Sequence, residues 1–181
     1  KYMNAGDLDD VLNMNLCRWE AEYGVSTIYR TPSVRFQTVI DTAYEKTGRQ
    51  VVILIDEYDK PLLDVLEEDL EDVNRSILKD FYGTFKAADA SLRFVLLTGV
   101  TKFSQITVFS GFNQPNDISM DSKYDAICGI TETELHTVFA GPIVEMANKL
   151  DYTVDEMKAV LKKQYDGYHF SEELVDVYNP F

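Results

Sequence analysis

The sequence has few of the features that mark secreted, membrane-spanning or nucleic-acid-binding proteins. Two cysteines among 181 residues, Cys17 and Cys128, exclude a disulfide-built scaffold and favour a reducing, cytoplasmic compartment. The longest uninterrupted apolar run, from Val51 to Ile55, is far shorter than the ~20 residues needed to span a bilayer. No charged and then apolar leader opens the chain, so we expect neither secretion nor a membrane partner.

Basic side chains are also scarce. The chain carries 17 Lys and Arg residues against 31 Asp and Glu residues, for a formal net charge of −14. Because contact with a phosphate backbone relies on many basic side chains, this acidic segment does not indicate a nucleic-acid partner. With 181 residues the chain has the length of one domain, or of a piece of a larger protein. It begins at Lys1 without a methionine, and we interpret it as an excised piece.

Apolar residues recur at helical spacing in five stretches, several of which have capping residues at their ends. A Ser or Thr followed three residues later by Glu is a capping box, which predicts the first residue of a helix. Glycine is favoured where a helix ends, and proline at its first position. The expected helices are residues 8–23, ended by Gly24; 32–47, with Thr31 as cap, Pro32 first and Gly48 at the end; about 70–88; 131–150, from a capping box at Thr131 and Glu134 and broken at Gly141-Pro142; and a last helix from a second box at Thr153 and Glu156.

Two apolar segments predict buried strands, residues 51–55 and 93–97. A helix of adequate length separates them, so the simplest connection is a right-handed β-α-β crossover that makes the strands parallel. Weaker strand signals occur at 107–109 and 126–128, and the polar stretch 111–123 between them predicts a loop. The fold class is therefore α/β, with helices covering a mostly parallel sheet.

Candidate functional residues follow both predicted strands. Asp56 and Glu57 come directly after the first strand, at the end where α/β sheets bind ligands. In phosphoryl transfer, an Asp at such a position holds Mg²⁺ and a neighbouring Glu polarises the attacking water. Thr98 ends the second strand, where its hydroxyl can meet a phosphate or that water, and Lys102 can reach a phosphate as a point charge. The alternatives are that the two acids only end a strand, Thr98 only makes a turn, and Lys102 is only solvated.

A complete nucleotide site also needs a glycine-rich phosphate loop, and the sequence contains none. The 9 glycines include none followed by lysine, and no G-x-G occurs. Other chemistries have weaker support, because His136 and His169 lack partners at metal-ligand spacing and no G-x-S-x-G motif is present. The aromatic segment 165–170 surrounds Gly167, and we interpret it as structural rather than as a binding site.

Several segments spread along the chain form a distinctive combination: 51–62 (VVILIDEYDKPL), 97–104 (LTGVTKFS), 109–113 (FSGFN), 117–119, Tyr124, 127–131 (ICGIT), 134–135, 165–170 (YDGYHF) and 177–181 (VYNPF). This combination resembles a bacterial family of predicted AAA-type ATPases. The resemblance covers essentially the whole chain. It implies a three-layer P-loop NTPase-like fold of the ASCE/AAA type, here with a partial parallel sheet and a helical C-terminal part. Members carry a phosphate loop of the R-R-F-G-K-S type, which would precede Lys1, and commonly continue beyond the position of Phe181 into a PD-(D/E)XK nuclease-like domain.

The resemblance assigns roles to some of these residues. Asp56 would order Mg²⁺, Glu57 would be the base or water-positioning group, and Thr98 would be the sensor. Residues 1–130 would form an incomplete ATPase core without the phosphate loop, and 131–181 the helical part of the same domain. ATP and Mg²⁺ are implied for the full-length protein, as a nucleotide switch that controls an attached effector domain, and we expect neither to be bound by this chain alone. An arginine finger cannot be chosen among Arg30, Arg35, Arg49, Arg75 and Arg93.

Two further expectations concern what the chain does if the nucleotide site is incomplete. The alternative to an ATPase is a non-catalytic scaffold or interaction module with a degenerate nucleotide site. A sheet that lacks its phosphate-loop strand exposes an edge, and such edges pair with other chains. We therefore expect this chain to self-associate.

Overall fold

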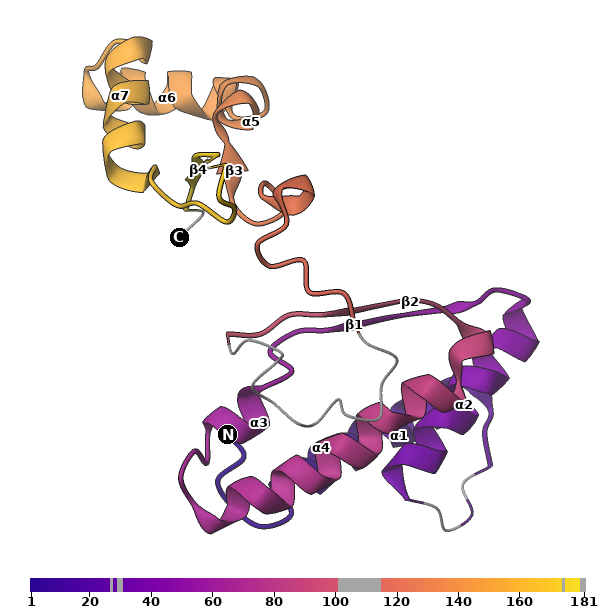
Figure 1. Ribbon diagram of the computed structural model, residues 1–181. Helices are drawn as coiled ribbons and strands as arrows, with labels where there is room; N and C mark the ends of the chain where they lie inside the picture. Colours follow the sequence, from indigo (N-terminus) through magenta and orange to yellow (C-terminus); the bar gives the residue numbers. More distant parts are fainter. Residues whose placement is uncertain (27, 29–30, 101–114, 174, 180–181) are drawn as a thin grey trace. The chain divides into compact units, whose positions relative to one another are not determined.

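A computed structural model describes residues 1–181 except 27, 29–30, 101–114, 174 and 180–181. The chain forms two compact units, Lys1–Pro115 and Asn116–Phe181, which are treated separately below (Figure 1). Among the described residues, no helix is both long and apolar enough to cross a membrane. The elements of the first unit are α1 (Asp7–Tyr23), α2 (Pro32–Thr47), β1 (Val51–Ile55), α3 (Lys60–Leu63), α4 (Asp69–Ala87), η1 (Asp89–Ser91) and β2 (Leu92–Leu97).

The long helices of the first unit begin and end close to the predicted residues. Pro32 is the first residue of α2, and Gly24 and Gly48 end α1 and α2 with φ of 62° and 65°. This left-handed conformation is the one that glycine adopts without a steric cost, which explains why both helices stop there. Thr31 occupies the capping position of α2, but its hydroxyl lies 3.0 Å from the Ser33 hydroxyl and makes no capping hydrogen bond.

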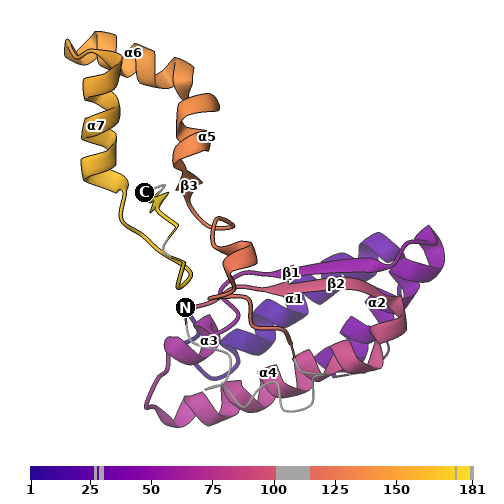
Figure 2. The same cartoon turned by 45° about the horizontal axis from the view of Figure 1, so that its top comes forward.

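The two strands of this unit form the predicted parallel pair. The register joins Val52 to Phe94 and Ile55 to Leu97, with one irregularity near Val51. Figures 1 and 2 show α1, α2 and α4 on the same side of the strands. Val52, Leu54 and Phe94 are 53%, 69% and 52% exposed, whereas Ile53, which lies between Val52 and Leu54 on β1, is buried. The sequence predicted burial on both faces; in the described part of the unit, helices cover one face only.

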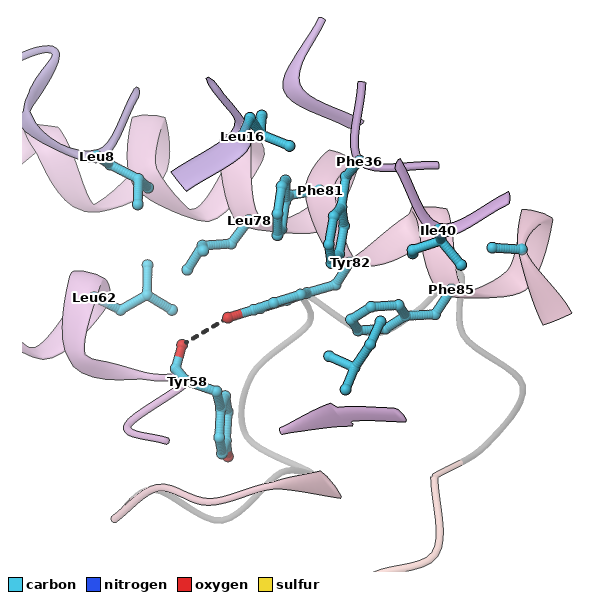
Figure 3. Close-up of a cluster of buried hydrophobic side chains, with 12 residues drawn as sticks. Leu8, Leu16, Phe36, Ile40, Tyr58, Leu62, Leu78, Phe81, Tyr82 and Phe85 are labelled. Atoms are coloured by element: carbon cyan, nitrogen blue, oxygen red, sulfur yellow. Dashed lines mark hydrogen bonds between the residues drawn. The ribbon is translucent and has the colours of Figure 1, made fainter. Parts of the chain in front are cut away.

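The core of the first unit lies between that covered face and the helices, and it is rich in aromatic rings. The rings of Phe36 and Phe81 stack with centroids 4.6 Å apart, and the Tyr82 hydroxyl donates a hydrogen bond to the Tyr58 carbonyl at 3.4 Å (Figure 3). Burial raises the pKa of the Tyr82 phenol, because the charged form would lose its hydration. The cluster consists of Leu8, Leu16, Phe36, Ile40, Ile53, Tyr58, Leu62, Leu78, Phe81, Tyr82, Phe85 and Ala88.

A buried ion pair ties α1 to α2. Arg35 donates two hydrogen bonds to Glu20, each 2.7 Å long, and the two side chains are 9% and 4% exposed. The same guanidinium donates to the Asn13 amide oxygen and to Cys17 Sγ. The hydrogen bonds that Arg35 donates to the Glu20 carboxylate raise the pKa of Arg35, so its guanidinium stays charged inside the unit. Such a two-pronged contact offsets part of the cost of removing both charges from water.

The second unit is built mostly from short helices with strong local signals. Both predicted capping boxes form: the Thr131 hydroxyl accepts from the Glu134 N–H, and the Thr153 hydroxyl accepts from the Glu156 N–H. A short antiparallel pair completes the unit, Ile130 with Tyr178 and Thr131 with Val177. The elements are η4 (Ser122–Tyr124), β3 (Ile130–Thr131), α5 (Glu132–Thr137), α6 (Ala140–Leu150), α7 (Val154–Tyr165) and β4 (Val177–Tyr178).

Two expectations for this region need correction. The break between helices falls at Val138 and Phe139, before Gly141-Pro142, because Pro142 sits in the first turn of α6, where no helical N–H bond is lost. Residues 126–128 form turns and bends rather than a strand, and the strand begins at Ile130. The other weak strand signal, 107–109, lies outside the described residues.

Candidate functional site

The strongest candidate site lies where β1 and β2 end. Because the strands are parallel and Ile55 is in register with Leu97, the residues that follow them meet at one edge of the sheet. The Thr98 hydroxyl donates a hydrogen bond to Asp56 Oδ1. Two backbone hydrogen bonds also join the residues at the ends of the two strands. The Thr98 N–H donates to the Ile55 carbonyl at 2.8 Å, and the Tyr58 N–H donates to the Thr98 carbonyl at 2.9 Å. Asp56 and Thr98, which the sequence analysis placed at the ends of two neighbouring strands, are therefore in contact.

Glu57 has an unusual backbone conformation. Its φ is 52°, in the left-handed region that costs a residue with a Cβ roughly 1–2 kcal/mol. Its N–H donates to Asp56 Oδ1 at 3.1 Å, and its side chain is exposed. This conformation turns the chain sharply between β1 and α3 and leaves the Glu57 carboxylate accessible from solvent.

The Asp56 carboxylate has room for a cation. Its Oδ1 accepts both hydrogen bonds just described, while Oδ2 has no hydrogen-bond partner among the described residues. No ion pair in the described part of the chain includes Asp56 or Glu57. Carboxylate and hydroxyl oxygens suit Mg²⁺. The described residues contain no cluster of three or more His, Cys, Asp or Glu side chains that could hold a metal on their own. These donors therefore fit a cation that has further ligands, such as phosphate or water.

Asp59 is a member of this region to which the sequence analysis assigned no role. It is 1% exposed, and its Oδ2 accepts a hydrogen bond from the Val100 N–H at 3.0 Å. Gly99 lies so close that a Cβ there would be 2.5 Å from Tyr58 Cε1 and 2.7 Å from Asp59 Oδ1. Asp59 and Gly99 together hold the turn after Thr98 against the start of α3. The sequence signal that could have indicated Asp59 is the second aspartate of Asp-Glu-Tyr-Asp, three residues after Asp56.

The basic residues near the site are engaged or not described. Lys60 pairs with Asp64, and their hydrogen bond raises the pKa of Lys60 and lowers that of Asp64. Of the candidate arginine fingers, Arg35 is buried against Glu20 and Arg75 pairs with Glu71. Lys102, the predicted phosphate contact, and Arg30 lie outside the described residues. The described part of the site is thus predominantly acidic.

The aromatic segment near the end of the chain has contacts of a structural kind. Tyr168 forms a β-bridge with Val177, and the Asn179 amide donates to the Tyr168 hydroxyl at 3.3 Å. His169 Nδ1 lies 3.2 Å from Asp176. These contacts close a loop around β4, while the side chains of Tyr165 and Tyr168 are 42% and 52% exposed.

Taken together, the geometry describes an α/β protein whose polar residues gather at the carboxyl end of a parallel strand pair, which is where such proteins bind ligands. Comparison with known proteins gives the family. Residues 1–109 match the family described as "Predicted AAA-ATPase", and the chain belongs to this family.

A relative in the bacterium Azotobacter chroococcum mcd 1 extends the likeness over nearly the whole chain. It is named "Uncharacterized protein in vnfD 5'region" and is 38% identical over 179 residues, or 97% of this chain. The chain spans 31% of that relative's length. No solved structure matches.

Proposed function

We propose that Asp56, Glu57 and Thr98 are the magnesium and water side of an ATP site, and that a phosphate loop elsewhere in a longer protein completes it. The hydrogen bond between Thr98 and Asp56 carries this proposal, because it joins the ends of two parallel strands. Membership of the predicted AAA-ATPase family supports it independently. The fold we propose for the longer protein is the three-layer P-loop NTPase type, in which this chain supplies part of the sheet.

Each residue has a role that follows from its contacts. Asp56 would hold Mg²⁺ through Oδ2, directly or through water, while the Thr98 hydroxyl and the Glu57 N–H fix Oδ1. Glu57 would orient or deprotonate the attacking water, since its carboxylate is exposed next to Asp56. Thr98 would report on the phosphate through its hydroxyl, and Lys102 would contribute a positive charge. A bound Mg²⁺ would supply charge that offsets the phosphate oxygens.

The acidic character of the described site explains why this chain should be inactive alone. Phosphoryl transfer depends on positioning and on neutralising phosphate charge. Asp56 and Glu57 add negative charge where a triphosphate needs the opposite. We therefore expect no measurable ATP hydrolysis by these 181 residues. Turnover by this chain that Glu57→Gln abolishes would contradict the proposal.

In the longer protein, the site would act as a nucleotide switch for an attached effector domain. The relative's length leaves room for such a domain, because this chain spans 31% of it. The competing function is a non-catalytic scaffold in which the nucleotide site is degenerate.

Calorimetric titration with ATP and Mg²⁺ separates these possibilities. We expect the longer protein to bind ATP·Mg²⁺ and this chain alone not to bind. Asp56→Asn in the longer protein should weaken the magnesium-dependent part of the affinity at least tenfold. Asp80→Asn, which removes the same charge from an exposed position on α4, is the matched control and should change the affinity less than twofold. Absence of binding by the longer protein would favour the scaffold.

A further inference from the structure

The aspartate that precedes α3 directs its carboxylate to a distant part of the chain. Asp59 occupies the capping position of this helix, where an Asp side chain commonly accepts a hydrogen bond from an N–H group of the first turn. Its side chain makes no such bond to α3, whose four residues are all described. Its Oδ2 instead accepts a hydrogen bond at 3.0 Å from the N–H of Val100, 41 residues along the chain. The carboxylate therefore binds a distant segment rather than the helix beside it.

Asp59 is itself held in place from two directions. Its carbonyl accepts hydrogen bonds from the N–H groups of Leu62 and Leu63 at 2.9 and 3.0 Å, which fixes it to α3. The carbonyl of the preceding residue, Tyr58, accepts from the buried Tyr82 hydroxyl of α4 (Figure 3). Asp59 is 1% exposed, and a carboxylate is rarely buried so completely unless hydrogen bonds compensate for the lost water. It is thus a fixed acceptor at the border of the core.

The segment that Asp59 binds follows directly from Thr98. Val100 is 86% exposed, so the bond from its N–H, and not packing of its side chain, anchors this segment. Gly99 allows the close approach, because a Cβ there would lie 2.7 Å from Asp59 Oδ1. The rotamers open to a side chain depend on its backbone conformation. A backbone fixed beyond Thr98 therefore favours one direction for its exposed hydroxyl, toward Asp56.

We propose that Asp59 is a positioning residue, which acts through the Val100 N–H to hold the Thr98 hydroxyl against Asp56. The role in catalysis rests on the function proposed above, in which Asp56 binds Mg²⁺ and Thr98 meets the phosphate. Asp59 is buried and contributes through the orientation of Thr98, without touching the nucleotide. Because a displacement of about 1 Å at a reacting group can lower a rate roughly a hundredfold, the effect falls on turnover more than on nucleotide binding.

Two substitutions separate this role from the capping of α3. Asp59→Ser keeps a residue that caps helices well, but its oxygen is one bond closer to the backbone and so withdraws from Val100. Asp59→Asn removes the charge and keeps an acceptor oxygen at the original length. If reach to Val100 is what matters, only the serine variant releases Thr98.

Nuclear magnetic resonance of this chain, without nucleotide, measures the result. Three-bond couplings to the Thr98 methyl carbon report its χ1 rotamer, and amide exchange of Val100 reports the hydrogen bond. We expect one rotamer in the parent and in Asp59→Asn. In Asp59→Ser we expect averaging among rotamers and roughly tenfold faster exchange at Val100, as for the loss of one hydrogen bond to a charged group. Asp41→Ala removes a carboxylate that accepts from the Ser91 hydroxyl at 2.6 Å, just before β2; it is the matched control and should leave one Thr98 rotamer.

The same couplings define what would overturn the inference. One Thr98 rotamer in a folded Asp59→Ser variant would do so, because capping alone would then suffice. Averaging in the parent, in Asp59→Asn or in Asp41→Ala would also do so, since each retains the acceptor for the Val100 N–H. Protected amides at 51–55 and 92–97 establish that a variant is folded.

Gly99→Ala gives the same test if Asp59→Ser unfolds the unit. The added Cβ would lie 2.5 Å from Tyr58 Cε1 and 2.7 Å from Asp59 Oδ1, so the turn must move away from the start of α3 while the carboxylate is kept. Averaging of the Thr98 rotamer is expected. One rotamer in a folded Gly99→Ala variant would contradict the inference.

Turnover of ATP by the longer protein adds a kinetic readout. Asp59→Ser should lower kcat by at least about tenfold and change the KM for ATP less than about twofold. In a Thr98→Val background it should lower kcat no further, because the hydroxyl that it orients is absent. Equal losses in both backgrounds would indicate a general structural effect and overturn the inference. A longer protein that hydrolyses no ATP would count against the proposed function instead, and the Thr98 rotamer in this chain would still decide the positioning role.

Discussion

The two units of this chain are stabilised by different means. The first has a core of 12 buried residues that extends in sequence from Leu8 to Ala88, so distant segments must come together before any of it is buried. In the described part of the second unit, the core cluster has five buried residues, and two of the three α-helices, α5 and α7, begin at capping boxes made by residues three positions apart. Long-range packing dominates the first unit and local hydrogen bonding contributes more to the second. Substitutions in the two units should therefore differ in how much they lower stability and in how far along the chain the loss extends.

The largest effect is expected from the aromatic stack. Phe36→Ala removes a 6% exposed ring that stacks on Phe81 and should lower the free energy of unfolding by about 3–5 kcal/mol, through lost burial and a cavity. Urea denaturation followed by circular dichroism measures it. Val34→Ala, at a 42% exposed position of the same helix, is the control and should cost no more than about 0.5 kcal/mol. Equal losses would show that the first unit does not depend on this core.

The next effect concerns the buried ion pair. Glu20→Ala leaves the charge of Arg35 buried without its partner and should lower the free energy of unfolding by about 3 kcal/mol. The double variant Glu20→Met with Arg35→Met should recover most of that loss, because both desolvated charges are removed together. Denaturation of the three proteins measures the coupling. A double variant as unstable as Glu20→Ala would mean that the pair contributes geometry that methionine cannot replace.

A smaller and more local effect is expected in the second unit. Thr153→Ala removes the side-chain acceptor at the start of α7 and should cost about 1 kcal/mol. Hydrogen exchange should show the loss in the amides of α7 and not in those of α4. Thr133→Ala, at an exposed position inside α5, is the matched control and should have a smaller effect. Loss of protection throughout the chain would contradict the distinction between the units.

The smallest effect is a pH dependence of the same capping boxes. Backbone hydrogen bonds from Thr131 and Thr153 lower the pKa values of Glu134 and Glu156 below the usual 4.5. The pKa values of Glu134 and Glu156 are lower in the folded chain than in the unfolded chain. The stabilisation that the two charged carboxylates give is therefore complete above pH 4.5 and is lost as the pH falls through the folded-state pKa values. Exchange in α7, compared between the parent chain and Glu156→Gln at pH values from about 6 to 3, measures it. A difference between the two that does not shrink on acidification would contradict the capping role of the charge.

The sequence predicted the local features well because neighbouring residues determine them. Gly24, Gly48 and the two capping boxes mark helix ends without reference to the rest of the fold. The meeting of Asp56 and Thr98 was predictable for another reason, since parallel strands bring their carboxyl ends to one edge.

The features that were missed depend on distant contacts. The pairing of β3 with β4 joins residues 130–131 to residues 177–178, and no local signal specifies that partner. The role of Asp59 depends on Val100, 41 residues away, and on the lack of space at Gly99. The exposure of Val52 and Leu54 was also not predicted, because an apolar strand is expected to be buried on both faces whether or not another element covers them.

The left-handed backbone of Glu57 has a consequence for how this position tolerates change. Selection for folding alone would place glycine or asparagine there, since both accept a φ of 52° at lower cost. A library screened for thermal resistance should therefore enrich Glu57→Asn, whereas one screened for the activity of the longer protein should retain Glu57. The two screens would disagree at this position, and the disagreement would separate the demands of folding from those of chemistry.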